Sequence, residues 1–520
     1  MGGLFFMQLP IRINFIYTLF MTFFASFLFM NTSASAAGIQ ETITEEEEYS
    51  PSASVVFVDG MKVNYPVRPI IKDGTTLVPL RETFESLGAT VKWNEEERSV
   101  FATKGNKDLY LKINSHKIMI NEQPRQISVP PVIYNGKTMI PLRLVGEAFG
   151  GTVEYDPESK IITITMSDLT ADFLTKEQDN ISNIRNVKEV RMSGDRRLML
   201  SDNPETLNSK TIKQENATLW NDIVKENGES VDHRVVGWHM NKLHKEITVG
   251  ITIENLSKTN TIEVRKLEGI HKISSNSWYD YDIGLPISES VLNNQLQPVN
   301  LSTNKAESGE TIMLGSFEIK PNEMIGFLQD FSVTKTSGTG ELNYVIRTVV
   351  SQNNSDLTQI KSTPVPADRT NMHPRGVWRS SELIAVLPTY HVQQDGELSY
   401  NISNGITDNI FNEENSLTEN ASSISNKGHY GAVYKVKLPY INHTDKEKTV
   451  RVRIASRGGS YSGTVKTKDG VFNISALDPN TEVVNVIDYT VEKKEGSIEL
   501  DIMHSGGSYL PSSINIAAIK

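Results

Sequence analysis

DGTTLVPLRETFESLGATVKWNEEERSVFAT, at residues 73–103, returns 62 residues further on as NGKTMIPLRLVGEAFGGTVEYDPESKIITIT, at residues 135–165. The two copies align without a gap. The residues of the first copy that recur in the second are Gly74, Thr76, Pro79, Leu80, Arg81, Glu85, Gly88, Thr90, Val91, Glu96 and Thr103. A repeat at a fixed offset predicts one structural unit built twice.

Each copy is predicted to form a strand, a helix and a hairpin of two further strands. The turn at residues 73–74 leads into the first strand, and Pro79 stands where the helix begins, since proline is tolerated in the first turn. Gly88 suits the left-handed residue that ends a helix. Arg81 and Glu85, four residues apart, are expected to pair on the helix surface. The buried helix face is predicted from its spacing to consist of Leu80, Phe84 and Leu87 in the first copy and Leu142, Val145 and Phe149 in the second.

This paired pattern, with its V/I-P-L-R and E-x-x-G-x-T-V segments, resembles the N-terminal (stalk) domain family of copper amine oxidases. The resemblance covers residues 55–166. It implies an α+β domain of two strand–helix–hairpin repeats, which is a structural appendage without catalytic activity of its own. Exported proteins of spore-forming Gram-positive bacteria often carry such a domain, so the resemblance also implies an exported protein of a Gram-positive bacterium.

The family name suggests copper-dependent amine oxidation. That activity requires a tyrosine in an Asn-Tyr-Asp/Glu motif, which becomes a quinone, and copper-binding histidines that include a His-x-His pair. The Asn-Tyr dipeptides here are Asn64-Tyr65-Pro66 and Asn343-Tyr344-Val345, and no two histidines are spaced as His-x-His. We therefore expect no amine oxidase activity and no cofactor.

Residues 1–36 have the pattern of a secretory signal peptide. Arg12 precedes an apolar run of 16 residues, and small residues then offer a cleavage site after Ala36 or Ala37. An uncleaved membrane anchor is the alternative, although 16 residues are few for a membrane-spanning helix. Residues 37–54 include four consecutive glutamates and are predicted to be an acidic linker.

The formal net charge of −11 and the lack of cysteine exclude several functions. An acidic exported chain is a poor nucleic-acid binder. A chain without cysteine has no disulfides, thiolate metal sites or cysteine nucleophiles. No later segment is apolar enough to span a membrane, so we expect no membrane contact after signal cleavage. We expect a secreted or wall-associated protein whose partner is a cell-wall polymer or another surface protein.

Residues 167–520 alternate β-branched and aromatic runs with Gly, Asn, Ser and Pro, as in KTVRVRIAS (448–456). Period-two alternation with frequent turn signals predicts β-sandwiches. The proline-rich segment KSTPVPADRTNMHPRG (361–376) suggests a boundary between two β-rich domains, at residues 167–365 and 373–520. The expected fold class is thus an α+β repeat domain followed by mostly-β, sandwich-like domains.

One aromatic and acidic cluster, Trp278-Tyr279-Asp280-Tyr281-Asp282, could bind a ligand. The rings of Trp278, Tyr279 and Tyr281 could stack on a sugar. Asp280 and Asp282 could supply two oxygen ligands to calcium. The alternative is a half-buried strand with one polar face.

Other candidate patterns do not fit their surroundings. His239 and His244 are five residues apart, which suits neither one helix face nor one strand face, so we interpret them as surface or packing residues. Residues 459–463 (GSYSG) superficially resemble a serine nucleophile motif, but the flanking strands predict a hairpin or bulge. The sequence GGSY occurs at 458–461 and 506–509, which suggests two similar bends in neighbouring strands.

Two functions stay open. We expect a non-catalytic cell-surface or cell-wall-associated protein, with an adhesive or spacer stalk domain and β-sandwich binding domains. The alternative is a secreted carbohydrate- or cell-wall-active hydrolase whose catalytic carboxylates lie in the β-rich part. Flat sandwiches without a cleft would favour the first, and a deep pocket with two converging carboxylates would favour the second.

Overall fold

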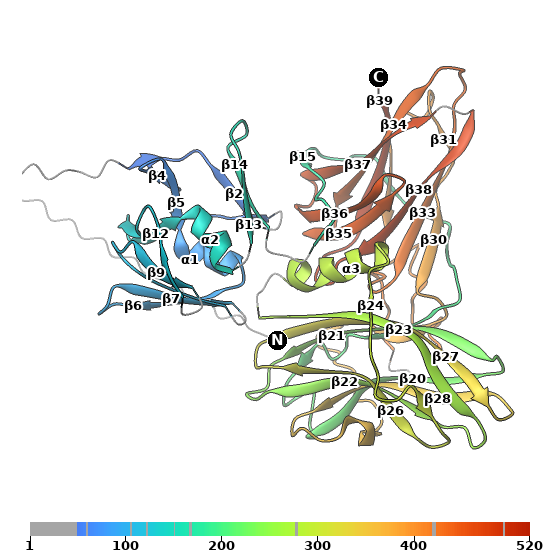
Figure 1. Cartoon of the computed structure of the whole chain (residues 1–520). Helices are drawn as coiled ribbons and strands as arrows, with labels where there is room; N and C mark the ends of the chain where they lie inside the picture. The colour runs from blue at the N-terminus through green and yellow to red at the C-terminus, as the bar shows by residue number, and fades with distance from the viewer. Residues whose placement is uncertain are drawn as a thin grey trace, which may run out of the picture. The chain divides into compact units, whose positions relative to one another are not determined.

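A computed structural model of the chain describes residues 49–58, 61–104, 107–120, 123–149, 151–165, 169–275, 279–418, 423–491 and 494–519. The predicted signal peptide with its cleavage site, most of the predicted acidic linker and Trp278 lie outside the described residues. The structure is mostly β (Figure 1). None of the described helices is long and apolar enough to span a membrane.

The repeat domain, blue to teal in Figure 1, contains three sheets and two helices among its described residues. One sheet has the order β1 (Ser50–Pro51), β4 (Ile70–Lys72), β5 (Thr75–Pro79), β12 (Lys137–Pro141), β11 (Val132–Tyr134). The second has the order β10 (Gln123–Gln126), β9 (Lys117–Ile120), β8 (Lys107–Lys112), β7 (Ser99–Lys104), β6 (Thr90–Asn94). The third has the order β13 (Thr152–Asp156), β14 (Ile161–Thr165), β2 (Val55–Val58), β3 (Met61–Lys62). The helices are α1 (Leu80–Ser86) and α2 (Leu142–Phe149).

The two sequence copies form the same order of elements. The first contains β5, α1 and the β6–β7 hairpin, and the second contains β12, α2 and the β13–β14 hairpin. The turns that precede β5 and β12 have positive φ at both central residues, 49° and 73° in the first copy and 47° and 73° in the second. Such turns match the right-handed twist of a hairpin. Because β5 pairs with β12, with Val78 opposite Ile140, the two copies share one sheet.

The apolar helix faces of the two copies form one core. Phe84 of α1 and Phe149 of α2 meet edge to face, with ring centroids 5.2 Å apart. Leu80 and Leu142 are 2% and 6% exposed. This burial explains the spacing of the apolar residues, which is i, i+4, i+7 in the first copy and i, i+3, i+7 in the second, because those positions lie on one side of a helix.

The middle sandwich consists of two antiparallel-rich sheets whose inner faces share a core. The larger sheet has the order β24 (Gln297–Pro298), β23 (Thr261–Ser274), β27 (Met324–Ser337), β21 (Ser230–Asn241), β18 (Arg197–Ser201), β29 (Arg375–Trp378), with β19 (Thr206–Leu207) beside β21 and β25 (Lys305–Ala306) beside β23. The smaller sheet has the order β20 (Asn216–Glu226), β28 (Leu342–Ser351), β22 (Ile247–Asn255), β26 (Thr311–Ile319), and a 3-10 helix (Leu357–Gln359) contacts it.

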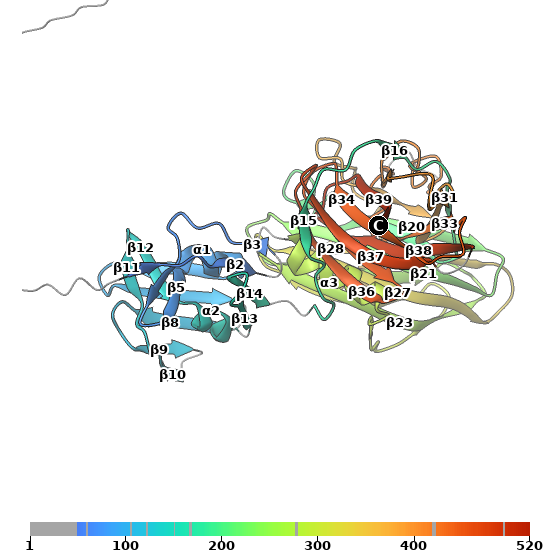
Figure 2. The ribbon, with the colours of Figure 1, turned by 90° about the horizontal axis from the view of Figure 1, so that it is seen from above.

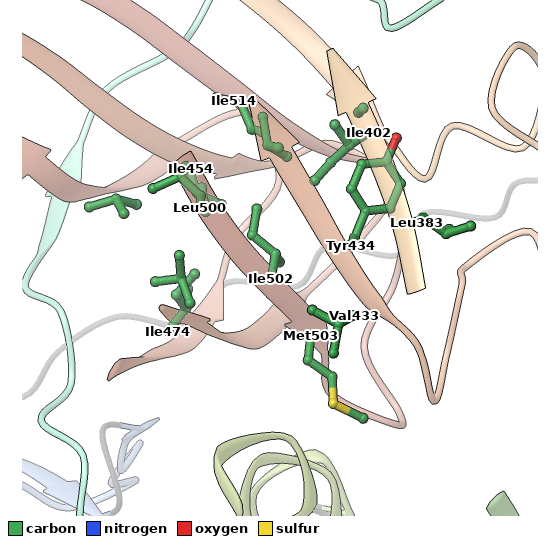
Figure 3. Close-up of a cluster of buried hydrophobic side chains, with 14 of the residues drawn as sticks. Leu383, Ile402, Val433, Tyr434, Ile454, Ile474, Leu500, Ile502, Met503 and Ile514 are labelled. Atoms are coloured by element: carbon green, nitrogen blue, oxygen red, sulfur yellow. The ribbon is translucent and has the colours of Figure 1, made fainter. Parts of the chain in front are cut away.

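The C-terminal sandwich is also built from two sheets, and Figure 2 shows β34, β37 and β39 side by side. One sheet has the order β15 (Lys176–Gln178), β37 (Glu482–Val491), β34 (Lys448–Ser456), β39 (Ser512–Ile519), β32 (Leu398–Ile402), β16 (Ile184–Asn186). The other has the order β17 (Val190–Met192), β30 (Glu382–Val386), β33 (Val433–Ile441), β38 (Glu495–His504), β35 (Tyr461–Thr467), β36 (Gly470–Leu477), with β31 (Tyr390–His391) beside β33. Figure 3 shows side chains of both sheets that meet in the core, including Ile454, Ile514, Leu500 and Ile502.

Strand β18, in the larger sheet of the middle sandwich, is buried on both faces. In β18, Met199 belongs to the core of the middle sandwich, whereas Leu198 and Leu200 belong to the core that includes the C-terminal sandwich. This division follows from the period of two, which sends alternate side chains to opposite faces. A π-helix (Asp280–Gly284) continues into α3 (Leu285–Leu292), which packs in the same second core.

The chain path interleaves the two sandwiches. Strands β15, β16 and β17, from the predicted domain of residues 167–365, pair with strands of the C-terminal sandwich. Conversely, β29, from the predicted domain of residues 373–520, pairs with β18 of the middle sandwich. The middle sandwich is therefore formed by a segment that leaves the C-terminal sandwich after β17 and returns to it after β29.

Candidate active site

A cavity of about 810 Å³ lies between the two sandwiches. Val236 and Trp238 of β21 form part of one wall, and the GGSY segment at 506–509 lies in another. Loop residues 372–374 and 403–405 also line it. Cavities of this size between packed domains commonly bind small molecules or short polymer segments.

Three side chains with acid, base or metal-binding capacity converge in the cavity wall. A carboxylate oxygen of Asp202, a carboxylate oxygen of Glu205 and a ring nitrogen of His373 all lie within 4.8 Å of one another. His373 Nδ1 is 3.0 Å from Glu205 Oε2 and 3.9 Å from Asp202 Oδ2. Asp202 is 8% exposed, whereas the His373 side chain is 38% exposed.

Strand pairing brings these residues together. Strands β18 and β29 are antiparallel, with Ser201 opposite Arg375. The residues that follow β18 and those that precede β29 therefore lie at the same end of the strand pair. Asn203, which is fully buried, joins the two connecting segments. Its Nδ2 donates to the backbone oxygens of Asp368, Asn371 and His373 at 3.0–3.2 Å, and its Oδ1 accepts from Asp368 N at 2.7 Å.

The loop that carries the two carboxylates is also fixed from β21. His239 Nδ1 donates to Pro204 O at 3.0 Å, and the backbone N–H of Met240 donates to Glu205 O at 2.8 Å. Burial lowers the pKa of His239 to about 4, so the ring is a neutral hydrogen-bonding group at pH 7. The structure places His239 in the interior and leaves His244 exposed.

Burial also raises the pKa values of the two carboxyl groups in the cluster, Asp202 and Glu205. It raises the pKa of Asp202 well above the usual range, and the nearby Glu205 carboxylate adds to that shift. Burial raises the pKa of Glu205 as well, and the His373 ring opposes this increase. Strong shifts on converging groups in a cavity are typical of functional sites.

A second polar group of residues meets the cavity at Ser403, which has a φ of 50°. Ser403 Oγ lies 2.9 Å from His429 Nδ1 and 2.8 Å from His504 Nε2, and His429 Nε2 lies 3.0 Å from Asp408 O. Since a carbonyl can only accept, His429 Nε2 carries the proton, and Ser403 O–H therefore donates to His429 Nδ1. His504 Nε2–H then donates to Ser403. The three hydrogen bonds therefore run in one direction, from His504 through Ser403 and His429 to the carbonyl oxygen of Asp408.

Residues 279–282 of the predicted aromatic and acidic cluster are helical. The expectation of a half-buried strand was wrong, because these residues lead into the π-helix (Asp280–Gly284). Tyr279 lines the cavity, whereas Tyr281 is buried at 1% exposure and its oxygen accepts from Ala476 N. Trp278, as stated above, is outside the described residues.

The two candidate calcium ligands are held by different serines. Asp280 Oδ2 accepts from Ser462 Oγ at 3.1 Å, and Asp282 Oδ2 accepts from Ser274 Oγ at 2.6 Å. Burial raises the pKa of Asp280, which the hydrogen bond from Ser462 opposes. Each carboxylate thus has a hydrogen-bonding role of its own in joining the helix to a neighbouring strand.

Asp202, Glu205 and His373 were not predicted from the sequence as site residues. His373 lies in the segment 361–376, whose prolines suggested a domain boundary. The only local signal was a pair of acidic residues, three apart, directly after a buried strand. The GGSY repeat did mark this region: its two copies touch, since Tyr509 N donates to Ser460 O at 2.9 Å, and the second lines the cavity.

The chain thus combines an α+β repeat domain with two β-sandwiches that enclose a cavity. Residues 57–164 match the family model described as the copper amine oxidase N-terminal domain, which confirms the resemblance seen in the sequence. A protein of Brevibacillus choshinensis described as a protease inhibitor is 30% identical over 95 residues. The match covers 18% of this chain and 29% of that protein, so this chain spans less than a third of that relative.

Two solved structures that align with much of this chain have low sequence identity to it. A Paenibacillus xanthan lyase is 7% identical over 83% of this chain and 38% of its own, with a TM-score of 0.12. The PBSX exported protein XepA is 10% identical over 71% of this chain and 94% of its own, with a TM-score of 0.10. TM-scores this low support no argument about fold or function.

Proposed function

We propose that the protein is an exported hydrolase that cleaves a cell-wall or cell-surface polymer in the cavity between its two β-sandwiches. The observation that carries the proposal is the convergence of Asp202, Glu205 and His373 in the wall of that cavity. A pocket with two converging carboxylates is the feature that separates a hydrolase from a non-catalytic surface protein. It favours the alternative over the function that the sequence alone suggested.

The three groups have the chemistry that hydrolysis requires. One group must accept a proton from the attacking water, and another must donate a proton to the leaving group. In the reaction the bond between two polymer units breaks, the hydroxyl of water joins one fragment, and its remaining proton ends on the other. Carboxylates and an imidazole within 4.8 Å of one another can serve both ends of this transfer.

Aromatic rings in the same cavity could hold a polymer segment. Tyr279, Tyr430 and Tyr509 line it, and Tyr509 is 63% exposed. Tyrosine rings present a flat apolar face for stacking and a hydroxyl for hydrogen bonding. These properties suit a sugar-containing polymer.

The repeat domain would act as the spacer or adhesive module of this hydrolase. Its match to a family of N-terminal domains favours a role as an accessory module rather than as the catalytic domain. The predicted signal peptide favours export. A pull-down with purified cell wall, scored with and without residues 55–166, tests this role. Equal recovery of both forms would contradict it.

The hydrolase proposal is tested by incubating the mature chain with purified cell wall and measuring soluble fragments. We expect release by the wild type and a loss of about 100-fold or more in Glu205→Gln, the scale of lost acid–base catalysis. Glu413→Gln is the matched control, because Glu413 also lines the cavity but lies outside the three-residue cluster. Binding without release would instead identify a non-catalytic surface protein.

A further inference from the structure

We propose that Asp202, Glu205 and His373 bind one divalent transition-metal ion, for which Zn²⁺ is the appropriate probe. The inference concerns the same three residues as the proposed function, but Zn²⁺ binding does not depend on polymer cleavage. With the ion bound, the three residues would be its ligands and a water in the fourth position would be the nucleophile, whereas in the ion-free chain they would serve as acid and base. It rests on the ligand types, their spacing, an unpaired buried oxygen and the scaffold that holds the loops.

The ligand types select the class of ion. One imidazole nitrogen with two carboxylate oxygens is a set that Zn²⁺ accepts, with ligand distances of about 2.0–2.2 Å. Ca²⁺ and Mg²⁺ prefer sets made of oxygen only, and a set without sulfur does not favour Cu(I). The His373 nitrogen is therefore the discriminating ligand.

The three ligand atoms all lie within 4.8 Å of one another, so binding requires no pair to close by more than about 1.5 Å. Ligands at these distances around a tetrahedral ion lie about 3.3 Å apart. His373 Nδ1 is 3.0 Å from Glu205 Oε2 and 3.9 Å from Asp202 Oδ2. The His373 side chain is 38% exposed, so its ring can turn toward Asp202.

An independent observation is the second oxygen of Asp202. Asp202 is 8% exposed, and its buried Oδ1 has no hydrogen-bond partner among the described residues. A buried carboxylate oxygen without a donor is costly, because it has lost water and gained nothing in return. The oxygen that faces His373 is Oδ2, and a cation bound there would offset the cost at the same carboxylate.

Hydrogen bonds behind the three proposed ligands hold the loops that carry them in place. Asn203 ties the segment before His373 to the loop of the two carboxylates through four hydrogen bonds. Such outer contacts fix ligands in place and raise metal affinity. Three protein ligands beside an open cavity also leave a fourth position for water, as in catalytic rather than structural zinc sites.

The test is calorimetric titration of the chelator-treated mature chain with Zn²⁺, without polymer. We expect one Zn²⁺ per chain, and an affinity at least tenfold weaker in His373→Ala and in Asp202→Asn. Zn²⁺ should also raise the melting temperature of the wild type, since an ion that binds only the folded state stabilises it, and the rise should vanish in His373→Ala. If Asp202→Asn does not fold, His373→Ala decides, because that side chain is partly exposed.

The matched control is a second histidine site on the surface. His391 Nδ1 lies 2.9 Å from His443 Nε2, and both residues are outside the cavity. The double variant His391→Ala/His443→Ala should keep the wild-type affinity within about twofold. Loss of binding in this double variant, binding that survives His373→Ala, or no binding by the folded wild type would each overturn the metal site.

The two proposals fail separately. A chain that binds Zn²⁺ in the cluster but releases no wall fragments overturns the proposed hydrolase and leaves the metal site. A chain that releases fragments but binds no Zn²⁺ overturns the metal site and leaves the hydrolase.

Discussion

At the scale of single residues, Asn203 connects the proposed site to the fold. Asn203→Ala removes hydrogen bonds to three backbone oxygens and one backbone N–H. We expect it to lower the free energy of unfolding by about 1–3 kcal/mol, the cost of leaving such groups unpaired, and to weaken Zn²⁺ binding. Urea unfolding measures the first effect. The control is Asn371→Ala, at an exposed position of the same segment, which should change stability by about 0.5 kcal/mol or less.

Two buried histidines make a pH-dependence prediction. Burial lowers the pKa of His429 and of His504 from 6.5 to about 3. Below pH 6.5 the unfolded chain binds protons at these residues while the folded chain does not. Stability is therefore complete above pH 6.5 and falls as the pH is lowered toward 3, by about 1.4 kcal/mol per pH unit for each histidine.

The measurement is chemical unfolding at pH 7.5 and pH 5. The loss of stability between the two should be smaller in His429→Gln than in the wild type, by about 1–2 kcal/mol. His244→Gln, at an exposed position, should leave the loss unchanged. If His429→Gln lost as much stability between pH 7.5 and pH 5 as the wild type does, the lowered pKa of His429 in the folded chain would be contradicted.

Sequence reasoning failed mainly at this scale. The three residues of the candidate site come from two distant segments, and only the pairing of β18 with β29 brings them together. No local spacing encodes that pairing. Asp280 and Asp282 formed a conspicuous local pattern, and in the structure each of them accepts a hydrogen bond from a serine distant from it or on another strand.

At the scale of elements, the helices of the repeat were predictable because their periodicity is local. Leu80→Ala or Leu142→Ala should destabilise a fragment of residues 50–168 by about 2–5 kcal/mol, as for buried leucines in general. Arg81→Ala is the control. Arg81 lies 3.3 Å from Glu85, but the two side chains are 48% and 55% exposed, so the loss should stay below about 1 kcal/mol. Thermal and urea unfolding of the fragment provide both values, and a non-cooperative transition would contradict its independence.

The strand predictions were less specific for a physical reason. Alternation indicated β-sandwiches after residue 167, which agrees with the paired sheets of the structure. It could not indicate which strands pair. In β18 every residue is buried, because the two faces belong to different cores, and a strand of this kind loses the polar face that would orient it.

At the scale of the whole molecule, the cores define the units that should unfold together. Among the described residues, the core of the repeat domain is formed by residues between Val56 and Ile164. The largest core, by contrast, contains Leu200 and Trp238 of the middle sandwich together with strands of the C-terminal sandwich. Separating the sandwiches would therefore expose the apolar side chains of this shared core.

We therefore expect the full mature chain to unfold in two calorimetric transitions, one for the repeat domain and one for both sandwiches. Leu80→Ala should lower only the first melting temperature. Trp238→Ala should lower only the second, because this 9% exposed ring packs where the sandwiches meet, so close to Gly506 that a Cβ there would lie 2.6 Å from it. A third transition that Trp238→Ala leaves in place would mean that the sandwiches unfold independently. In that case the cavity would lie at a joint that opens on its own, rather than inside one cooperative unit.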